Sequence, residues 1–531
     1  MLGMRVLIFG LLATKVMIAV DLNATQSFAQ ELREPLQQSE IAPVQDAAGL
    51  TKRGVEAFKK GDHVKASEDF EAAIRIDPKF AEAYVQRASL RLAEGRLDEA
   101  FADSNLAVKL DPENADGYEI RGTVHWERNQ LDNAIKDYSE AIQHAPSNLR
   151  PYLGRALAWN AMGKPDNAIN DLGECIRIAP FAIAFDLRAS IWHKKHENEK
   201  AIADYSEAIR LDPEFAMAYF GRGDVLLSMH KPEDAVKDYS ESIRLTPDFI
   251  DAYRQRAECY AEKGEVQKAI ADCDVVIKLD PMDARAFLAR GVMCEKLKNH
   301  DQAIEDYSEA IRLDKNYTLA YMNRGVLWYW KGDYDKAVAD FTEVIRREPS
   351  AVAYVHRAGS LFEKKEYRKA VADYENAIEL NGRESAYFGA RAICWDKLGE
   401  FKKAIADHDE AIRLAPLDAN LYSDRGNTWG HLRNYAKAMK DQETAIRLDP
   451  QLAQAWHYRG VIKAAQGKFK AAIDDYTRAI ELDPQRAVVY FARSASYSAI
   501  GDKTKAEADE TRARELGLGS QTSTPRSNGA E

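Results

Sequence analysis

The sequence has few cysteines, and beyond residue 29 it has no apolar run close to the ~20 residues that cross a membrane. Its five cysteines all stand at apolar positions and form no CxxC pair: Cys175, Cys259, Cys273, Cys294 and Cys394. This usage favours core packing over a disulfide framework or a thiolate metal site. A disulfide between Cys273 and Cys294 is a minor alternative.

The chain also lacks the short motifs of catalysis. No phosphate-cradling loop, nucleophile elbow or helical His-Glu-x-x-His segment occurs. His193 and His196 lie near each other, but no third metal ligand stands beside them, so we expect a solvated turn there. Acidic residues exceed basic ones by 85 to 74, a formal net charge of −11, which argues against nucleic-acid binding. We therefore predict a protein that is not an enzyme and uses no cofactor and no metal.

The N-terminal residues 1–29 differ in kind from the rest. They contain Arg5, apolar stretches on both sides of Lys15, and a small-x-small motif that ends at Ala29. The pattern predicts a secretory signal peptide cleaved after Ala29, a periplasmic or secreted protein, and no integral membrane span after cleavage. Two alternatives stay open, because Lys15 shortens the apolar run: an uncleaved N-terminal membrane anchor, or an upstream start-site artefact of a cytosolic protein.

The remainder is one repeat array. An alanine precedes an aspartate by three residues fourteen times, at a spacing of 34 residues with two spacings of 33. The array predicts fourteen repeats over residues 47–520, between a linker at 30–46 and a disordered tail at 521–531, which leaves no room for a catalytic domain. The alanines are Ala66, Ala100, Ala134, Ala168, Ala201, Ala235, Ala269, Ala303, Ala337, Ala370, Ala404, Ala438, Ala472 and Ala506.

Each repeat has the pattern of two helices joined by a tight turn. In the repeat that ends at Pro484, apolar or small residues recur every three to four positions over 455–462, and again over 470–482. Gly467 separates these two stretches, and Asp483-Pro484 ends the second. Asn129 takes the glycine's place in one repeat, and eight repeats have glycine there: Gly61, Gly95, Gly163, Gly264, Gly332, Gly399, Gly467 and Gly501.

Three further positions complete the repeat: an aromatic in the first helix (Tyr321, for example), a Gly or Ala four residues later (Gly325), and a closing proline (Pro349). The pattern resembles the tetratricopeptide repeat (TPR), in a bacterial-type tandem array with a signal peptide. The resemblance implies an all-α fold, a right-handed superhelical α-solenoid of tandem helix-turn-helix repeats that share one core. We expect small residues such as Gly122 and Gly460 to let the two helices approach closely.

One regular feature departs from the usual repeat. An arginine precedes the small residue in all fourteen repeats, and an aspartate follows it sixteen residues later. This spacing predicts a structural ladder of Arg–Asp pairs between packed helices, since a partly buried guanidinium needs a carboxylate. A ligand-binding stripe is the alternative. The ladder includes Arg222, Asp238, Arg256, Asp272, Arg290, Asp306, Arg324 and Asp340.

The resemblance also implies a concave groove, lined by first-helix residues, that takes peptides. Mapped onto the eighth to tenth repeats, it gives an apolar stripe beside a more acidic stretch of Asp224, Glu258 and Glu262. Ordinary spacing of core residues is the alternative, although a helix cannot bury the consecutive Trp328, Tyr329 and Trp330 on one face. The putative groove comprises Leu288, Val292, Met322, Val326, Tyr329, Trp330, Val355 and Phe362.

We therefore predict a non-enzymatic scaffold or adaptor that binds protein or peptide segments on the concave face, in the cell envelope. The alternative is a regulatory or assembly subunit of an envelope secretion or polymer-export machine. A cytosolic co-chaperone-like adaptor is less favoured, because such TPR proteins grip a terminal carboxylate with Lys and Asn. The groove positions here carry pairs such as Leu288 and Val292, or Ser423 and Asn427.

Overall fold

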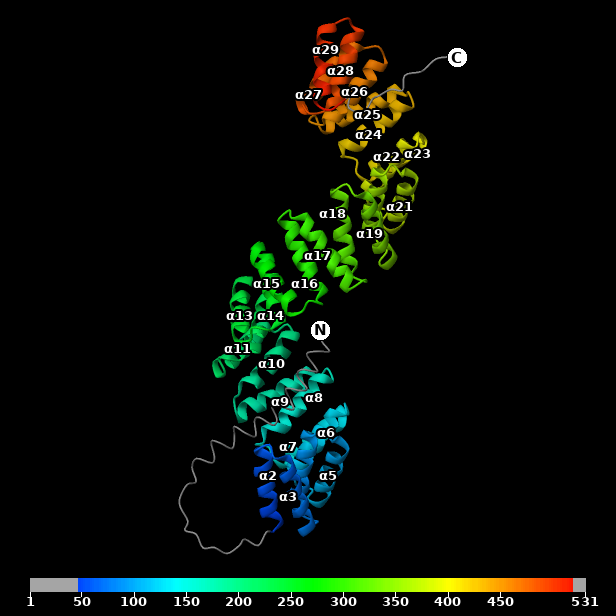
Figure 1. Ribbon diagram of the computed structural model, residues 1–531. Helices are drawn as coiled ribbons and strands as arrows, with labels where there is room; N and C mark the ends of the chain where they lie inside the picture. The colour runs from blue at the N-terminus through cyan, green and yellow to red at the C-terminus, as the bar shows by residue number, and fades with distance from the viewer. Residues whose placement is uncertain (1–45, 519–531) are drawn as a thin grey trace, which may run out of the picture. The chain divides into compact units, whose positions relative to one another are not determined.

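The computed structural model describes residues 46–518. The predicted signal peptide, most of the predicted linker and the predicted tail therefore lie outside the described residues. The chain divides at Val275/Val276 into an N-terminal half and a C-terminal half, each a compact body, and we describe each half by itself. Within residues 46–518 every regular element is an α-helix, so both halves are all-α (Figure 1).

The N-terminal half contains the first repeats, each a helix of 13 residues followed by one of 14, as in α2 and α3. Its helices are α2 (Ala47–Lys59), α3 (His63–Ile76), α4 (Ala81–Ala93), α5 (Leu97–Leu110), α6 (Ala115–Glu127), α7 (Leu131–His144), α8 (Leu149–Ala161), α9 (Pro165–Ile178), α10 (Ala182–Lys194), α11 (Asn198–Leu211), α12 (Ala216–Ser228), α13 (Pro232–Leu245) and α14 (Ile250–Glu262). Helix α15 (Val266–Leu279) contains the boundary.

The C-terminal half continues the same alternation of first and second helices. Its helices are α16 (Ala284–Lys296), α17 (His300–Leu313), α18 (Thr318–Trp330), α19 (Tyr334–Arg347), α20 (Ala351–Glu363), α21 (Tyr367–Leu380), α22 (Ser385–Lys397), α23 (Phe401–Leu414), α24 (Ala419–His431), α25 (Tyr435–Leu448), α26 (Ala453–Ala465), α27 (Phe469–Leu482), α28 (Ala487–Ala499) and α29 (Lys503–Glu515). Leaving α15 aside, the two helices of a repeat pack on each other in both halves, and each second helix packs on the next first helix, as α19 does on α20.

The turns and helix ends follow from local backbone chemistry. All eight predicted turn glycines have a positive φ, as has Asn129 at 56°, which is the region that favours glycine. Five other residues adopt it in the same place: His196, His230, Lys298, Lys365 and Arg433. At the other end of a repeat, Asp483 is in a non-helical conformation (φ −139°, ψ 86°) before Pro484, because proline disfavours helical backbone in the residue before it.

The core of each half consists of small residues and aromatic rings that face each other. The repeated alanines, such as Ala303 and Ala472, are fully buried. A Cβ added to Gly460 of α26 would lie 2.6 Å from the ring of Tyr476 in α27, and one added to Gly122 would lie 3.0 Å from Tyr138. The missing side chain therefore makes the space that the tyrosine ring occupies.

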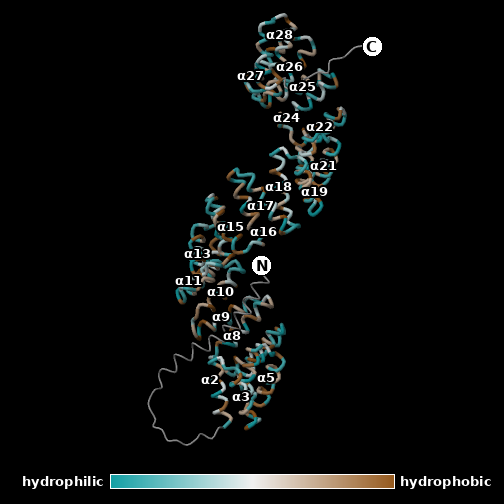
Figure 2. The backbone as a smooth tube through the Cα atoms, in the orientation of Figure 1, coloured by the Kyte–Doolittle hydropathy of each residue, from teal (hydrophilic) through white to brown (hydrophobic). Residues whose placement is uncertain are grey.

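Hydropathy follows this packing. Hydrophobic and hydrophilic residues alternate along the helices of residues 46–518 (Figure 2), which is the pattern of helices that bury one face. All five cysteines are buried. Burial raises the pKa of the Cys175 thiol to about 12.

Candidate functional site

Every arginine of the predicted ladder meets its aspartate side-on. In the pair Arg222–Asp238, Nε donates to Oδ2 and Nη2 donates to Oδ1, both at 2.8 Å. The aspartates are buried; Asp306 is only 2% exposed. The pairs are Arg53–Asp69, Arg87–Asp103, Arg121–Asp137, Arg155–Asp171, Arg188–Asp204, Arg222–Asp238 and Arg256–Asp272 in the N-terminal half, and Arg290–Asp306, Arg324–Asp340, Arg357–Asp373, Arg391–Asp407, Arg425–Asp441, Arg459–Asp475 and Arg493–Asp509 in the C-terminal half.

The same guanidinium also ties a repeat to the one before it. Nη1 of Arg222 donates to Ser206 Oγ at 3.0 Å, on the second helix of the preceding repeat, and Nη1 of Arg324 donates to Ser308 Oγ at 2.9 Å. Each guanidinium from Arg87 onward lies over the aromatic ring three residues earlier; for Arg324 the distance to the Tyr321 centroid is 5.8 Å. In Arg222 and Arg324 the guanidinium thus joins three helices, and its donors are used inside the fold.

One repeat lacks an acceptor for this third bond, and the gap gives a test. Gly173 of α9 stands where Ser139 and Ser206 stand in other repeats, and a Cβ built on it would lie 3.8 Å from Arg188 Nη1. Gly173→Ser is expected to raise the free energy of unfolding by about 0.5–1.5 kcal/mol, through helix propensity and one new hydrogen bond. Urea unfolding of the full chain measures the change. Gly173→Ala is the control for propensity, and a serine no more stable than the alanine would contradict the bond.

The predicted apolar stripe lies on α16, α18 and α20 of the C-terminal half. Its members differ in exposure: Leu288 is buried, whereas Trp330, at the end of α18, is 74% exposed. The others are half-buried, namely Val292, Met322, Val326, Tyr329, Val355 and Phe362. Val355 and Phe362 pack against the core cluster that contains Leu361 and Val371. The stripe therefore combines a packed base with one projecting indole.

Around that indole the structure gathers aromatic rings. The Tyr329 ring centroid lies 6.2 Å from that of Trp330 and 5.6 Å from that of Tyr334 in α19. Tyr329 also reaches α20, because a Cβ on Gly359 would lie 4.0 Å from its Cε2 atom. We call Tyr329, Trp330 and Tyr334 the aromatic cluster. It offers ring faces to a partner on a support fixed by three helices.

The acidic stretch belongs to the N-terminal half. Asp224 accepts a hydrogen bond from the Tyr239 hydroxyl at 2.9 Å. Burial raises the pKa of Glu258, and the nearby carboxylates of Glu262 and Asp224 raise it further. A cationic group placed there would relieve this repulsion.

A second region of the C-terminal half was not singled out from the sequence. We call Asp396, Asp424, His431, His457 and Tyr458 the polar stretch; these residues come from α22, α24 and α26. His431 Nδ1 lies 3.0 Å from Asp396 Oδ1, and the His457 and Tyr458 rings stack at 5.3 Å. Gln454 donates to Asp424 at 2.8 Å. Burial nevertheless raises the pKa of Asp424 to about 6.

The buried residues next to the polar stretch are polar as well, and we call His408 and Gln442 the polar floor. His408 and Gln442 are fully buried, yet His408 Nδ1 and Gln442 Oε1 have no hydrogen-bond partner among residues 46–518, and the same holds for Ser423 Oγ and His457 Nδ1. Burial lowers the pKa values of His408 and His457 to about 4, so both rings are neutral at pH 7. The sequence could have revealed these buried polar residues. His408 and Gln442 replace the aromatic residue found at the same repeat position elsewhere, such as Tyr374 and Tyr476.

Residues 46–518 contain neither a metal-binding group of side chains nor a membrane-spanning helix. Among residues 46–518, no group of three or more His, Cys, Asp or Glu side chains lies close enough to hold a metal ion. His196 is exposed in a turn, and His193 lies near Asn198, with Nδ1 3.4 Å from Oδ1. Within the same residues, no helix is both long enough and apolar enough to cross a membrane. Repeated helix pairs that pack on one another define a helical-repeat protein.

Comparison with known families identifies the repeat. One tetratricopeptide repeat model matches residues 51–115, 121–183, 223–284, 329–377 and 355–419, which is more than half of the chain. Three further TPR models match 190–229, 284–317 and 431–496. The chain belongs to the tetratricopeptide repeat family. None of the curated proteins matches it in sequence.

Solved structures with similar folds include other TPR proteins. The crystal structure of MamA is 25% identical over 31% of this chain and 96% of its own, with a TM-score of 0.30. A chain of the APC/C hetero-tetramer Cut9–Hcn1 is 13% identical over 85% of this chain and 96% of its own, with a TM-score of 0.36. YrrB, described as a TPR protein with an unusual peptide-binding site, is 22% identical over 34% of this chain and 95% of its own, with a TM-score of 0.31.

Proposed function

We propose that this protein is a non-enzymatic scaffold that holds partner polypeptides on the first helices of its C-terminal half, with the aromatic cluster as the anchor. TPR proteins in general bind protein or peptide partners, and the family membership supports that much. The observation that carries the finer proposal is the Trp330 indole, which projects with 74% of its surface exposed beside two supporting tyrosine rings. Exposed aromatic residues of this kind are typical of interface hot spots.

We place this scaffold in the cell envelope. The support is the pattern of residues 1–29, with its apolar stretches and the small-x-small motif before Gln30. The crosslinked partner is therefore sought in the envelope fraction and, for comparison, in the cytosolic fraction. A role in assembling an envelope export or secretion machine agrees with such a location, but no feature of the described residues favours it over a general scaffold.

The test replaces Trp330 and uses Leu417, an apolar residue of similar exposure, as the control. A photo-crosslinking residue is placed at 330 or at 417, because Leu417 lies in the loop between α23 and α24 and is 80% exposed. Position 330 is expected to yield a discrete crosslinked partner that position 417 does not. Trp330→Ala is expected to weaken binding of that partner at least tenfold, as for a hot-spot residue, while Leu417→Ala leaves it unchanged. Identical partners and affinities for both variants would overturn the anchor.

A further inference from the structure

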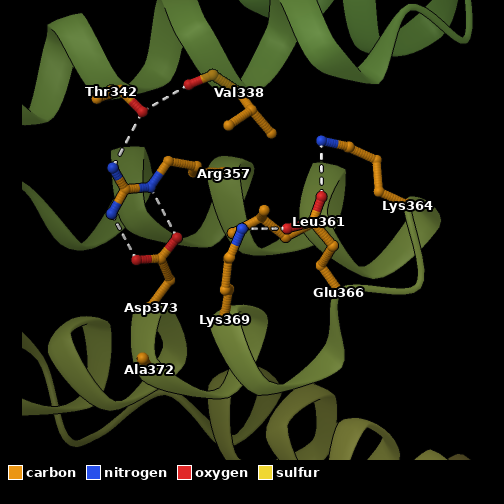
Figure 3. A pocket seen from close by; sticks show the side chains of 9 residues that line it. All are labelled: Val338, Thr342, Arg357, Leu361, Lys364, Glu366, Lys369, Ala372 and Asp373. Atoms are coloured by element: carbon orange, nitrogen blue, oxygen red, sulfur yellow. Dashed lines mark hydrogen bonds and ion pairs between the residues drawn. The ribbon is translucent and has the colours of Figure 1, made fainter.

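A pocket opens between α19, α20 and α21, and none of the three residues of the aromatic cluster lines it. It has a volume of about 380 Å³, within the roughly 300–1,000 Å³ of ligand pockets. Figure 3 shows Leu361 at its centre, with Lys364 and Lys369 directed toward Glu366, and Arg357 held by Asp373 and Thr342. The lining residues are Val338, Thr342, Arg357, Leu361, Lys364, Glu366, Lys369, Ala372 and Asp373.

The repeat pattern explains why this space is empty. Leu361 stands at the first-helix position that holds a tryptophan or tyrosine in seven other repeats: Trp159, Trp192, Tyr260, Trp328, Trp395, Trp429 and Tyr497. In the preceding repeat the Trp328 ring lies 4.1 Å from Lys336 Nζ and 5.9 Å from Lys331 Nζ. Lys369 and Lys364 occupy the equivalent positions 33 residues later. The pocket thus lies where other repeats have the indole ring of a tryptophan, because this repeat has the smaller Leu361 at that position.

The two lysines are arranged to receive a ring. In neighbouring repeats the matching lysine stacks on its own tryptophan, as Lys403 does on Trp395 at 4.3 Å and Lys437 on Trp429 at 4.1 Å. At the pocket, Lys364 bonds to Asp335 at 2.6 Å, and both Lys364 and Lys369 bond to Glu366, at 2.7 Å and 2.5 Å. These bonds hold the pKa of Glu366 down to about 2. Both ammonium groups therefore stand at the rim of a cavity whose apolar sides are Val338, Leu361 and Ala372.

We propose that this pocket takes an aromatic side chain, preferentially the indole of a tryptophan, from a partner polypeptide. The negative face of an indole complements the two ammonium groups and the Arg357 guanidinium, through the cation–π attraction that the other repeats already use. Leu361, Val338 and Ala372 supply the apolar contacts. This inference rests on the proposed scaffold function in one respect: the ring belongs to a partner polypeptide. The site itself shares no residue with the aromatic cluster.

The experiment titrates the full chain with fluorinated N-acetyl-tryptophanamide, followed by ¹⁹F NMR, with N-acetyl-alaninamide as the probe without a ring. Saturable binding of the tryptophan probe and none of the alanine probe is expected. Leu361→Trp supplies the missing ring from within and is expected to abolish binding while raising the melting temperature. Trp330→Ala is expected to leave probe binding unchanged, so failure of the aromatic cluster and failure of this pocket are distinguishable.

A matched pair of lysine variants tests the contact itself. Lys369→Ala is expected to weaken probe binding at least threefold, whereas Lys403→Ala, beside the resident Trp395, leaves it unchanged. The proposal is overturned if the wild-type chain shows no saturable binding, if folded Leu361→Trp binds as well as wild type, or if both lysine variants behave alike. Free indole binding at least tenfold tighter than the amide would identify a small molecule, not a polypeptide, as the occupant and would equally overturn it.

Discussion

Asp306→Ala is expected to lower the free energy of unfolding by about 2–4 kcal/mol, because it leaves a partly buried guanidinium without its carboxylate. Asp306 is only 2% exposed and accepts both Arg290 Nε, at 3.0 Å, and Arg290 Nη2, at 2.6 Å. Gln302 adds a third, longer contact at 3.4 Å. The expected loss of stability is therefore that of a desolvated ion pair, which exceeds the loss expected for a surface salt bridge.

The matched control lies on the same helix. Glu309 and Arg312 of α17 form an exposed pair at 2.6 Å, and Glu309→Ala is expected to cost less than about 0.5 kcal/mol. Repeat arrays do not always unfold in one step, so the measurement combines urea unfolding with hydrogen exchange of the α16 and α17 amides. Equal effects of the two variants would show that the buried pair contributes no more than a surface contact.

The second large effect is a change in acid stability on replacing His408. Its ring is 1% exposed and occupies the place of Tyr374 in the preceding repeat. Burial is the main cause of its lowered pKa, about 4; Arg425 lowers it further, whereas Asp396 and Asp409 oppose the shift. His408→Tyr is expected to stabilise the chain, and by about 2 kcal/mol more at pH 5 than at pH 7.5.

The sign follows from proton linkage. The folded pKa of about 4 lies below the ordinary value of 6.5, so between these values the unfolded chain binds a proton that the folded chain does not. The stability tied to His408 is complete above about pH 6.5 and declines as the pH falls toward 4. His457 acts in the same direction, while Asp424, with a pKa raised to about 6, opposes them between its ordinary value and pH 6.

Gln442 provides the control for this variant. It occupies the same repeat position one repeat later, is fully buried, and carries no titratable group. Gln442→Tyr is therefore expected to change stability equally at both pH values. Thermal melts of both variants at pH 5 and pH 7.5 measure the difference. A gain from His408→Tyr that does not depend on pH would contradict the assigned linkage.

Much of the fold could be predicted from periodic positions. The recurrence of Ala, Asp-Pro and a turn glycine identified the helix pairs, because each of these residues acts through local backbone geometry or through contact inside one repeat. The Arg–Asp spacing of sixteen residues indicated which side chains face each other across a pair. Gly122 and Tyr138 follow the same rule, since a missing Cβ and a ring must occupy one space.

The candidate sites were harder to predict, because they depend on which positions break the pattern. The stripe from Leu288 to Phe362 named the exposed Trp330, yet spacing did not distinguish it from buried Leu288. The polar floor at His408 and Gln442 was missed, although its substitutions are visible in the sequence. Leu361, which lines the pocket, was not singled out from the sequence.

The sequence by itself determined the repeat, its helices, its turns and its regular charge pairs, since these are set by contacts that recur every 34 residues. Only the tertiary structure decided that guanidinium groups such as that of Arg222 also reach the preceding repeat, that Trp330 projects, and that Leu361 leaves a cavity. The physical reason is that bonds and packing within a repeat depend on spacing along the chain. Exposure and empty volume depend instead on the side chains that neighbouring repeats bring to the same place.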